Sequence, residues 1–487
     1  MNRGPIVRAR ALLGRKFVQD VMALQLGRFA STGVGLLATL VVTRVVGPAG
    51  YGVYGLANSI FSLFAILNIS GAGQSTQTRL PKAIATGDTD GARDVMAWHV
   101  QSMSLFTFGI AGLMLLFAPA YAALTQGNAM IGWLAAMLAL TGPADGMVVL
   151  ISAALQSKRQ MRSLASLQAT SQVILAVAMI ALALLSGTAA ALIVARLIHS
   201  YTVLVLSIFL YGRQRAQGEM GLPTLRAVCA RALRVSPRPY WRFGVANAFD
   251  RNLHALMTQL PLQFVGMIGG DQAAGYLGLG LRGFAQVAVF TSALFDAMQA
   301  VVPRAVARGE YAALWRVLWR TVLALAGGSL LVYGTMALVA PFVIPPLFGR
   351  EWIPAVPAIM VLALYGALTT VGGVFGPVYR ALGMMRLAVI SKGIPLLIVL
   401  PLGALWLQSF SVPDLSAFAG LTVLPTGLAT VAQASAAAAA GALLVNLLFT
   451  TSVGITAVVI LRAVRSRARR DLALPQTEDL APPAAPA

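Results

Sequence analysis

The sequence predicts an all-α integral membrane protein with about 12 transmembrane helices, arranged in two pseudo-symmetric six-helix lobes around a central cavity. Three observations predict this fold class. The chain is too apolar for a soluble protein, its apolar stretches have the length of membrane spans, and its two halves repeat several short patterns in the same order. The first observation indicates the solvent, the second the number of helices and the third the division into lobes.

The composition indicates that most of the chain lies in lipid. Of its 487 residues, 58% are hydrophobic and 10% are charged, whereas a soluble domain carries about 25% charged residues. A soluble fold of this length could not bury so much apolar surface. The net charge of +21 would suggest nucleic acid in a soluble protein. Here the basic residues border apolar stretches, as cytoplasmic flanks do, so no nucleic-acid partner is expected.

Apolar stretches of about 20 residues, the length that a spanning helix needs, occur twelve times along the chain. The first six are near 21–46, 50–70, 96–118, 129–155, 163–185 and 188–212, and the second six are near 243–268, 276–301, 320–343, 353–378, 387–407 and 433–461.

Basic residues alternate along the chain as the positive-inside rule requires. Most of the 36 Lys and Arg lie in segments that this topology places inside, and the intervening outside loops hold one basic residue, Arg350. The inside segments are the N-terminus, 79–93, 158–162, 213–242, 304–320, 380–392 and 462–470. Both termini are therefore expected in the cytoplasm.

Four segments follow from this topology. Residues 1–212 form an N-terminal lobe, 213–242 a basic cytoplasmic linker, 243–462 a C-terminal lobe and 463–487 a disordered cytoplasmic tail. The linker is expected to contain an amphipathic helix around Leu225–Leu233. Its apolar face would lie on the membrane interface while its arginines meet anionic lipid headgroups.

An internal repeat relates the two halves. Three pairs of patterns recur in order: Ala49-Gly50-Tyr51 with Ala274-Gly275-Tyr276 at an offset of 225, the eight residues from Pro81 with those from Pro303 at 222, and Pro119 and Gly127 with Pro341 and Gly349 at 222. Each half holds an even number of spans, so the halves are parallel repeats, whose substrate sites lie at their interface. This arrangement is typical of an alternating-access transporter.

Arginines inside the predicted spans are the candidate binding residues. Arg28 and Arg251 begin the two halves at an offset of 223, and Arg282 lies in the first turns of the eighth span. An arginine at a helix centre costs about 2.5–3.5 kcal/mol on insertion scales, so such residues face a wet cavity or a partner. If they converge on one central cavity, their guanidinium groups suit a phosphate or carboxylate ligand. Arg196, which shares a helix face with His199, is a fourth candidate.

The alternative is that these arginines pair with local acids, since buried charges are normally paired. Asp145, Asp250 and Asp296 are the interior acids that could serve. Acids inside a membrane are also candidates for coupling transport to protons or sodium ions. No cofactor or metal is expected, because the sequence has neither a phosphate-binding G-x-x-x-x-G-K-[ST] loop nor a metal-ligand cluster.

Two short segments carry a resemblance to a known family. Val45-Val46-Gly47-Pro48-Ala49-Gly50-Tyr51-Gly52, preceded by Arg44, and Pro346-Leu347-Phe348-Gly349-Arg350-Glu351-Trp352 resemble motifs of the polysaccharide (O-antigen or exopolysaccharide) flippases. Asp250, followed by the turn between Gly266 and Tyr276, resembles the start of that family's second half. These flippases belong to the multidrug/oligosaccharidyl-lipid/polysaccharide exporter superfamily.

The resemblance implies a transporter and not an enzyme. Its cargo would be an undecaprenyl-diphosphate-linked oligosaccharide, flipped across the bacterial inner membrane for lipopolysaccharide or exopolysaccharide biosynthesis, with the polysaccharide polymerase and export machinery as partners. It also implies a V-shaped bundle with a cationic cavity. The alternatives are a cation-coupled drug antiporter of the same superfamily, a lipid II flippase, which typically carries two further spans, and a membrane polysaccharide polymerase, which needs a larger outside loop than 408–432.

Overall fold

The computed structural model describes residues 15–158, 160–216, 222–287, 289–409 and 426–473, and every regular element in this part of the chain is a helix. The first half comprises α2 (Arg15–Ala65), α3 (Ala72–Ala85), α4 (Thr89–Gln126), α5 (Ala129–Ala139), α6 (Gly142–Ser157), α7 (Met161–Ser186) and α8 (Ala189–Ala216). A short helix, α9 (Leu225–Ala232), follows. The second half comprises α10 (Arg238–Val287), α11 (Val289–Ala307), α12 (Tyr311–Phe348), the 3-10 helix η1 (Arg350–Ala355), α13 (Val356–Gly373), α14 (Phe375–Ala381), α15 (Met385–Ser409) and α16 (Thr426–Ala473).

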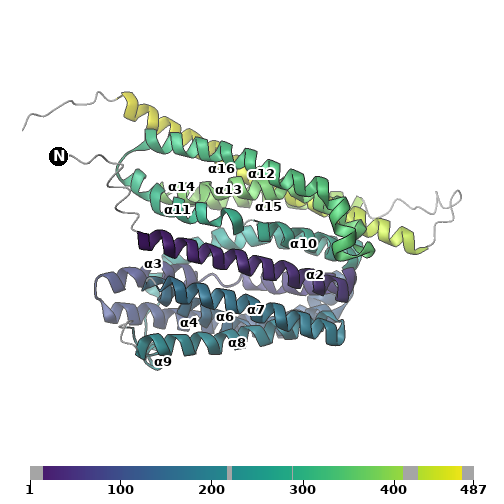
Figure 1. The fold of residues 1–487 in the computed structure, drawn as a ribbon, viewed down its shortest axis with the longest axis horizontal. Coiled ribbons are helices and arrows are strands. Elements are labelled where there is room, and N and C mark those ends of the chain that lie inside the picture. The colour runs from purple at the N-terminus through teal and green to yellow at the C-terminus, as the bar shows by residue number, and fades with distance from the viewer. Residues whose placement is uncertain (1–14, 159, 217–221, 288, 410–425, 474–487) are drawn as a thin grey trace, which may run out of the picture.

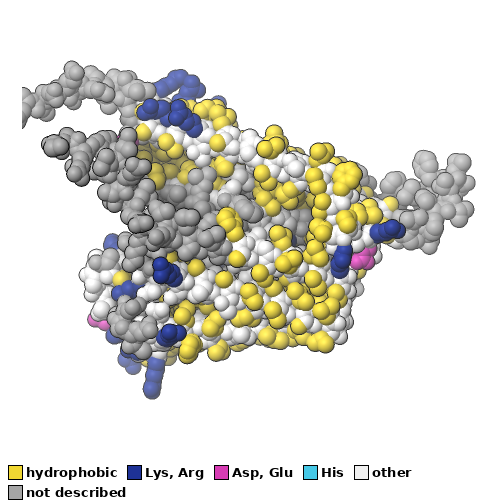
Figure 2. Space-filling model, in the orientation of Figure 1, with side chains coloured by type: hydrophobic (Ala, Val, Ile, Leu, Met, Phe, Trp, Pro, Cys, Tyr) yellow, Lys and Arg dark blue, Asp and Glu magenta, His cyan; other side chains and the backbone are white. Residues whose placement is uncertain are grey.

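The helices form two lobes. In Figure 1 the purple-to-blue helices of the N-lobe (α2–α8) fill the lower half of the view, and the green-to-yellow helices of the C-lobe (α10–α16) fill the upper half. The largest contact between the lobes joins α2 to α10. Hydrophobic side chains cover the middle of the face in Figure 2, with Lys and Arg near its ends. This is the pattern of a membrane-embedded bundle with charged ends.

Sharp kinks divide α2 and α10 into two arms each. Gly47 has φ 71° and ψ 175°, and Gly270 has φ 70° and ψ −171°. These left-handed values favour glycine, because a Cβ atom there would clash with the backbone. The two kinks lie 223 positions apart, as the repeat predicts. Each long helix therefore makes two passes joined by a tight reversal.

The number of spans confirms the predicted fold class. Among the described residues, nine helices are long and apolar enough to cross a membrane, and α2 counts as one of them. Its division at Gly47 makes ten passes. The two arms of α10, which Gly270 separates in the same way, bring the total among the described residues to the predicted twelve.

Several spans are longer or more broken than the sequence predicted. The helix predicted at 96–118 extends over Thr89–Gln126, because polar helical turns continue beyond its apolar centre. The second span ends at Ala65, and a separate helix, α3, follows after a break. The fourth span consists of α5 and α6, and Pro143 stands in the first turn of α6. Proline is accepted at this helical position, where no intrahelical N–H bond is lost.

The amphipathic linker helix forms as predicted, but its apolar face does not lie on the membrane interface. Thr224 caps α9 by accepting a hydrogen bond from the Ala227 N–H, at 3.1 Å. Val228 and Ala232 are buried in a cluster that includes residues of α4. Arg231 donates to the Asp94 carboxylate of α4, at 2.8 Å. The helix is therefore docked on the N-lobe, with its apolar face packed against protein.

The predicted segment boundaries also need correction at two places. Helix α10 begins at Arg238, inside the predicted linker 213–242. Helix α16 continues to Ala473, so the first part of the tail 463–487 is helical and not disordered, because the apolar pattern runs on through Leu461 and Val464 with arginines between. The rest of that tail lies outside the described residues, as do residues 1–14 and 410–425.

The two lobes touch backbone to backbone where α2 and α10 reverse direction. A Cβ on Gly52 would collide with the Asp271 carbonyl oxygen, and one on Gly275 would collide with the Pro48 carbonyl oxygen. Glycine is thus required at both positions to let the two helices touch backbone to backbone. This explains why the Ala-Gly-Tyr pattern recurs in the two halves.

An aromatic clasp, formed by Tyr51, Tyr54, Tyr276, Arg282 and Trp352, closes this same end of the bundle. The Trp352 ring lies edge-on between Tyr51 and Tyr276, at centroid distances of 5.8 and 6.0 Å. Its Nε1 donates to the Thr43 carbonyl across the lobe interface, at 3.3 Å. Arg44 likewise donates to the Pro346 carbonyl. The two segments that carried the family resemblance therefore meet here, on opposite sides of the interface.

Candidate functional site

Two polar cavities lie along the lobe interface, away from the aromatic clasp. One, of about 410 Å³, is lined mainly by α10, α13, α14, α15 and α16, and is called the C-lobe cavity. The other, of about 450 Å³, is lined mainly by α2, α4, α6 and α10, and is called the N-lobe cavity. Arg251 lines both cavities. Each volume is in the usual range for small-molecule sites.

Three consecutive residues of α10 have separate roles around these cavities. Asp250 binds side chains of α14 and α15 in the C-lobe. Asn252 donates to the Ile66 carbonyl at the break that follows α2, at 2.6 Å, and so binds the N-lobe. Successive residues of a helix point about 100° apart, which places Arg251 between these two directions. Among the described residues, Arg251 makes no hydrogen bond or ion pair.

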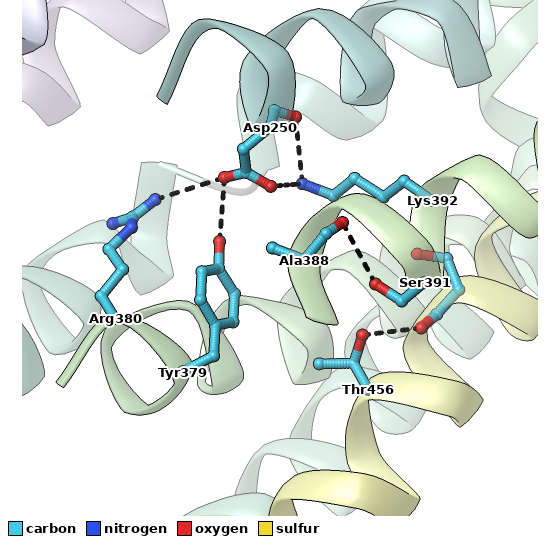
Figure 3. A network of polar contacts seen from close by, with 8 residues as sticks. Asp250, Tyr379, Arg380, Ala388, Ser391, Lys392 and Thr456 are labelled. Carbon is cyan, nitrogen blue, oxygen red and sulfur yellow. Dashed lines mark hydrogen bonds and ion pairs between the residues drawn. The ribbon is translucent and has the colours of Figure 1, made fainter. Parts of the chain in front are cut away.

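An ionic cluster fills one wall of the C-lobe cavity and is called the Asp250 cluster: Asp250, Tyr379, Arg380 and Lys392 (Figure 3). The Lys392 ammonium donates to Asp250 Oδ1 at 2.5 Å and to the Asp250 carbonyl at 3.2 Å. The Tyr379 hydroxyl donates to Oδ2 at 2.9 Å, and an Arg380 guanidinium nitrogen lies 3.8 Å from the same oxygen. The Asp250 side chain is 9% exposed. A carboxylate so buried needs this number of donors.

The charges lining the C-lobe cavity do not balance. Among the described lining residues, Arg251, Arg380 and Lys392 are positive and Asp250 is negative, which leaves an excess of two positive charges. His254 and Gln299 add hydrogen-bonding groups to the wall. The two excess positive charges can therefore be neutralised by a ligand that carries two negative charges.

The N-lobe cavity is lined by one described acid, Asp145, and one described cation, Arg251. Asp145 is already paired, since Arg196 donates to its carboxylate at 3.0 Å. Arg196 also contacts His199 at 3.0 Å, and His199 contacts the Ser171 hydroxyl at 2.9 Å. This row of polar groups leads from the cavity into the lobe, and within it Arg196 is paired with a local acid.

The predicted site residues are distributed over several places. Arg28 and Arg251 are equivalent, each nineteen positions before its kink at Gly47 or Gly270. Arg28 is half-buried on α2 and does not line either of the two cavities described here. Arg282 stacks on Tyr54 and Tyr51 of α2, at 4.5 and 5.3 Å, and belongs to the aromatic clasp. The expected convergence of three arginines on one cavity is thus not seen.

Of the predicted acids, Asp250 and Asp145 line the two cavities, and the side chain of Asp296 on α11 lies outside the described part of the structure. The residues that the sequence analysis missed are Tyr379, Arg380 and Lys392. The predicted topology counts Arg380 and Lys392 with the inside segment 380–392. Lys392 is preceded by Leu387-Ala388-Val389-Ile390, so its position two turns into an apolar helix was an available signal.

Comparisons with solved structures define the class of this fold. The chain is similar to an inward-facing multidrug resistance MATE family transporter of the MOP superfamily, with a TM-score of 0.65 and 15% identity over 93% of this chain and 99% of that one. It is also similar to the eukaryotic MATE transporter AtDTX14, with a TM-score of 0.62 and 13% identity over 93% and 98% of the two chains. A third similar structure is a MOP superfamily transporter from Pyrococcus furiosus, described by a reversed polarity of its binding pocket, with a TM-score of 0.57 and 14% identity over 92% and 95%.

The chain is therefore a multi-pass membrane protein with the two-lobed fold of MOP superfamily transporters. Its sequence matches the polysaccharide biosynthesis protein family over residues 41–357. The match covers more than half of the chain, and the chain belongs to this family. No curated protein matches the sequence significantly.

Proposed function

We propose that this protein is an alternating-access transporter that flips an undecaprenyl-diphosphate-linked oligosaccharide from the cytoplasmic to the outer leaflet of the bacterial inner membrane. The observation that carries the proposal is the two-charge excess of the C-lobe cavity, together with Arg251, which faces both cavities without a partner among the described residues. A lipid diphosphate has the opposite charge, and guanidinium pairs with phosphate oxygens bidentately. Membership of the polysaccharide biosynthesis family supports a saccharide cargo.

The aromatic clasp acts as the outer gate in this proposal. The reversals at Gly47 and Gly270 fall where the distribution of basic residues predicts the outside, with both termini in the cytoplasm. The clasp is closed, so cargo enters from the cytoplasmic leaflet and leaves after the lobes separate at this end. Movement of two parallel repeats around a site at their interface is the usual geometry of such transporters.

A coupling ion would have to compete with existing ion pairs. Asp145 is held by Arg196 at 3.0 Å, and Asp250 is held by Lys392 at 2.5 Å. A proton or sodium ion must displace one of these cations before either acid can take it. Asp296 remains the third candidate for such coupling.

The drug antiporter is the second candidate, favoured by the multidrug transporters among the similar folds. Cationic drugs bind to cavity carboxylates, whereas both described cavity acids are already paired and the C-lobe cavity is cationic. A lipid II flippase is disfavoured because the described residues account for twelve passes, two fewer than that class typically has. The family match adds nothing for a polymerase. Neighbouring polymerase and export proteins, and anionic headgroups at the basic ends, are the partners that the proposal implies.

The direct test is flipping in proteoliposomes of a fluorescent, short-chain polyprenyl-diphosphate sugar. Truncating one member of a desolvated charge pair costs about 2–5 kcal/mol, so Arg251→Ala should slow flipping at least about tenfold. Arg308→Ala is the matched control, since this arginine is 73% exposed and makes only a loose 3.7 Å pair with Glu310. Flipping by the wild-type protein no faster than in empty liposomes, or full activity of Arg251→Ala, would refute the proposal.

A further inference from the structure

The Asp250 cluster has the composition of an oxyanion site that is already filled. An ammonium, a guanidinium and a phenol hydroxyl, from Lys392, Arg380 and Tyr379, converge on the carboxylate of Asp250 (Figure 3). Cationic and hydroxyl donors of these kinds also bind phosphate oxygens. The donors come from α14 and α15, whereas the carboxylate comes from α10. The anion therefore belongs to one helix and its binding groups to others.

The bundle itself does not require this ion pair. At the repeat offset of 223, Gly27 stands in the place of Asp250, and Ala169 stands in the place of Lys392. The N-lobe thus builds the equivalent helices without either charge. A buried pair adds little stability compared with apolar residues of similar size. Its presence in only one lobe, on a cavity wall with excess positive charge, points to a role in binding.

We propose that Asp250 is an internal stand-in for the cargo: its carboxylate occupies the anion site of Lys392 and Arg380 while the carrier is empty, and a lipid diphosphate displaces it. This inference rests on the proposed function and identifies the diphosphate subsite within it. Arg251, the next residue on α10, supplies a further cation to the same cavity. The diphosphate takes over the donors, and the displaced Asp250 stays beside the remaining positive charge.

Displacement of Asp250 also changes which helices hold α10. The first turns of α10 are packed on the N-lobe, where Tyr240 stacks on Trp98 at 4.9 Å and Trp241 stacks on Phe106 at 6.2 Å. Asp250 is the point at which α10 is tied by charge to α14 and α15. When cargo takes its place, α10 keeps its N-lobe contacts and loses this tie. Cargo binding thereby frees α10 from α14 and α15 while it stays packed on the N-lobe, which lets the rest of the C-lobe move relative to the N-lobe, as alternating access needs.

The test measures binding of farnesyl diphosphate, a probe without sugar, to the purified full-length protein in detergent by isothermal titration calorimetry. Because Asp250 competes with the probe, Asp250→Asn should bind it more tightly, by about tenfold or more for the removal of one nearby charge. Lys392→Gln should bind it more weakly. In the double variant, the gain from Asp250→Asn should shrink, since the two residues act on one site.

Two controls keep the result specific. Asp94→Asn removes an acid that pairs with Arg231 and lines neither of the two cavities, and it should change the affinity less than about twofold. Should Asp250→Asn fail to fold, as judged by size-exclusion chromatography and thermal unfolding, Asp250→Ser keeps a small polar group and should show the same tighter binding.

The outcomes separate the two proposals. If the wild-type protein does not bind farnesyl diphosphate, the diphosphate site of the proposed function is refuted. If the wild-type protein binds it but neutral substitution of Asp250 leaves the affinity equal or lower, the cargo site stands and the stand-in role of Asp250 is refuted.

Discussion

The two lobes share a scaffold and differ in how they hold charge. Gly47 and Gly270 have nearly the same φ, as do Gly87 and Gly309 at an offset of 222, so the repeated halves reverse and terminate their helices in the same way. In the N-lobe cavity, the acid Asp145 is paired within its own lobe. The C-lobe cavity is lined by three cations and one carboxylate, and two of these cations, Arg380 and Lys392, pair with the carboxylate of Asp250. The two halves therefore share the same helix reversals and ends, whereas the excess positive charge is found in the C-lobe cavity.

Burial sharpens the comparison between the two ion pairs. The side chains of Arg196 and Asp145 are 31% and 37% exposed, whereas those of Lys392 and Asp250 are 17% and 9% exposed. A partly exposed pair contributes about 0–1 kcal/mol. Removing one partner of a buried pair costs about 3–5 kcal/mol, because the other charge stays buried alone. Breaking the ion pair should therefore lower the free energy of unfolding more in the C-lobe than in the N-lobe.

The largest expected effect is on stability at the C-lobe pair. Lys392→Met should lower the free energy of unfolding by about 3 kcal/mol, because Asp250 keeps only Tyr379 and a distant Arg380. Asp145→Asn, the N-lobe counterpart, should lower it by less than about 1 kcal/mol. Thermal or denaturant unfolding in detergent measures both.

A double variant, Asp250→Asn with Lys392→Met, tests the reason for this effect. It should recover most of the lost stability, since no unpaired charge remains buried. Equal destabilisation by Lys392→Met and Asp145→Asn would show that the two lobes do not differ in this respect.

Much of the scaffold was predictable from the sequence, because it depends on local and periodic features. Apolar length predicted the spans, and the offset of 223 between Arg28 and Arg251 matches the spacing of the two kinks. Arg251 could be identified as a cavity residue because an arginine in the middle of a span faces either a wet cavity or a charged partner.

The rest of the site depends on contacts between distant parts of the chain. Arg282 looked like a cavity residue, but Tyr51, its partner, lies 231 positions away and no local pattern reveals the contact. Lys392 was counted only with the inside segment 380–392, because the positive-inside rule counts charges without knowing which helix positions face the interior of the bundle. Helix α3 was missed because its polar sequence has no membrane signal, and its N-lobe packing stabilises it.

The glycines at the lobe contact offer the next test of the shared frame. Gly52→Ala would place a Cβ against the Asp271 carbonyl oxygen, whereas nothing lies within 4 Å of a Cβ on Gly55, one turn further along the same arm. Overpacking of this kind costs about 1–3 kcal/mol, which shifts the lobes away from the closed clasp by about five- to a hundredfold. Gly55→Ala is the matched control and should shift them little.

The readout for the glycines is a single cysteine at Ala274, which is fully buried beside the contact, in a Cys229→Ser background. A membrane-impermeant maleimide added from outside should label this cysteine faster in Gly52→Ala than in Gly55→Ala. Equal labelling in the two variants would mean that the backbone contact does not hold the outer end closed.

The smallest expected effect concerns the asymmetric part of the clasp, which only the C-lobe supplies with an arginine. Arg282 lies 4.5 Å from the ring centroid of Tyr54, and a cation–π contact of this kind is worth about 0.5–2 kcal/mol. Tyr54→Leu keeps an apolar side chain at this buried position and removes the ring, so labelling at position 274 should rise by a few-fold, less than in Gly52→Ala. Tyr201→Leu, a tyrosine 46% exposed on α8, is the control and should not change the labelling. If Tyr54→Leu also leaves labelling unchanged, Arg282 does not help to hold the clasp closed, and its burial against α2 must then serve packing alone.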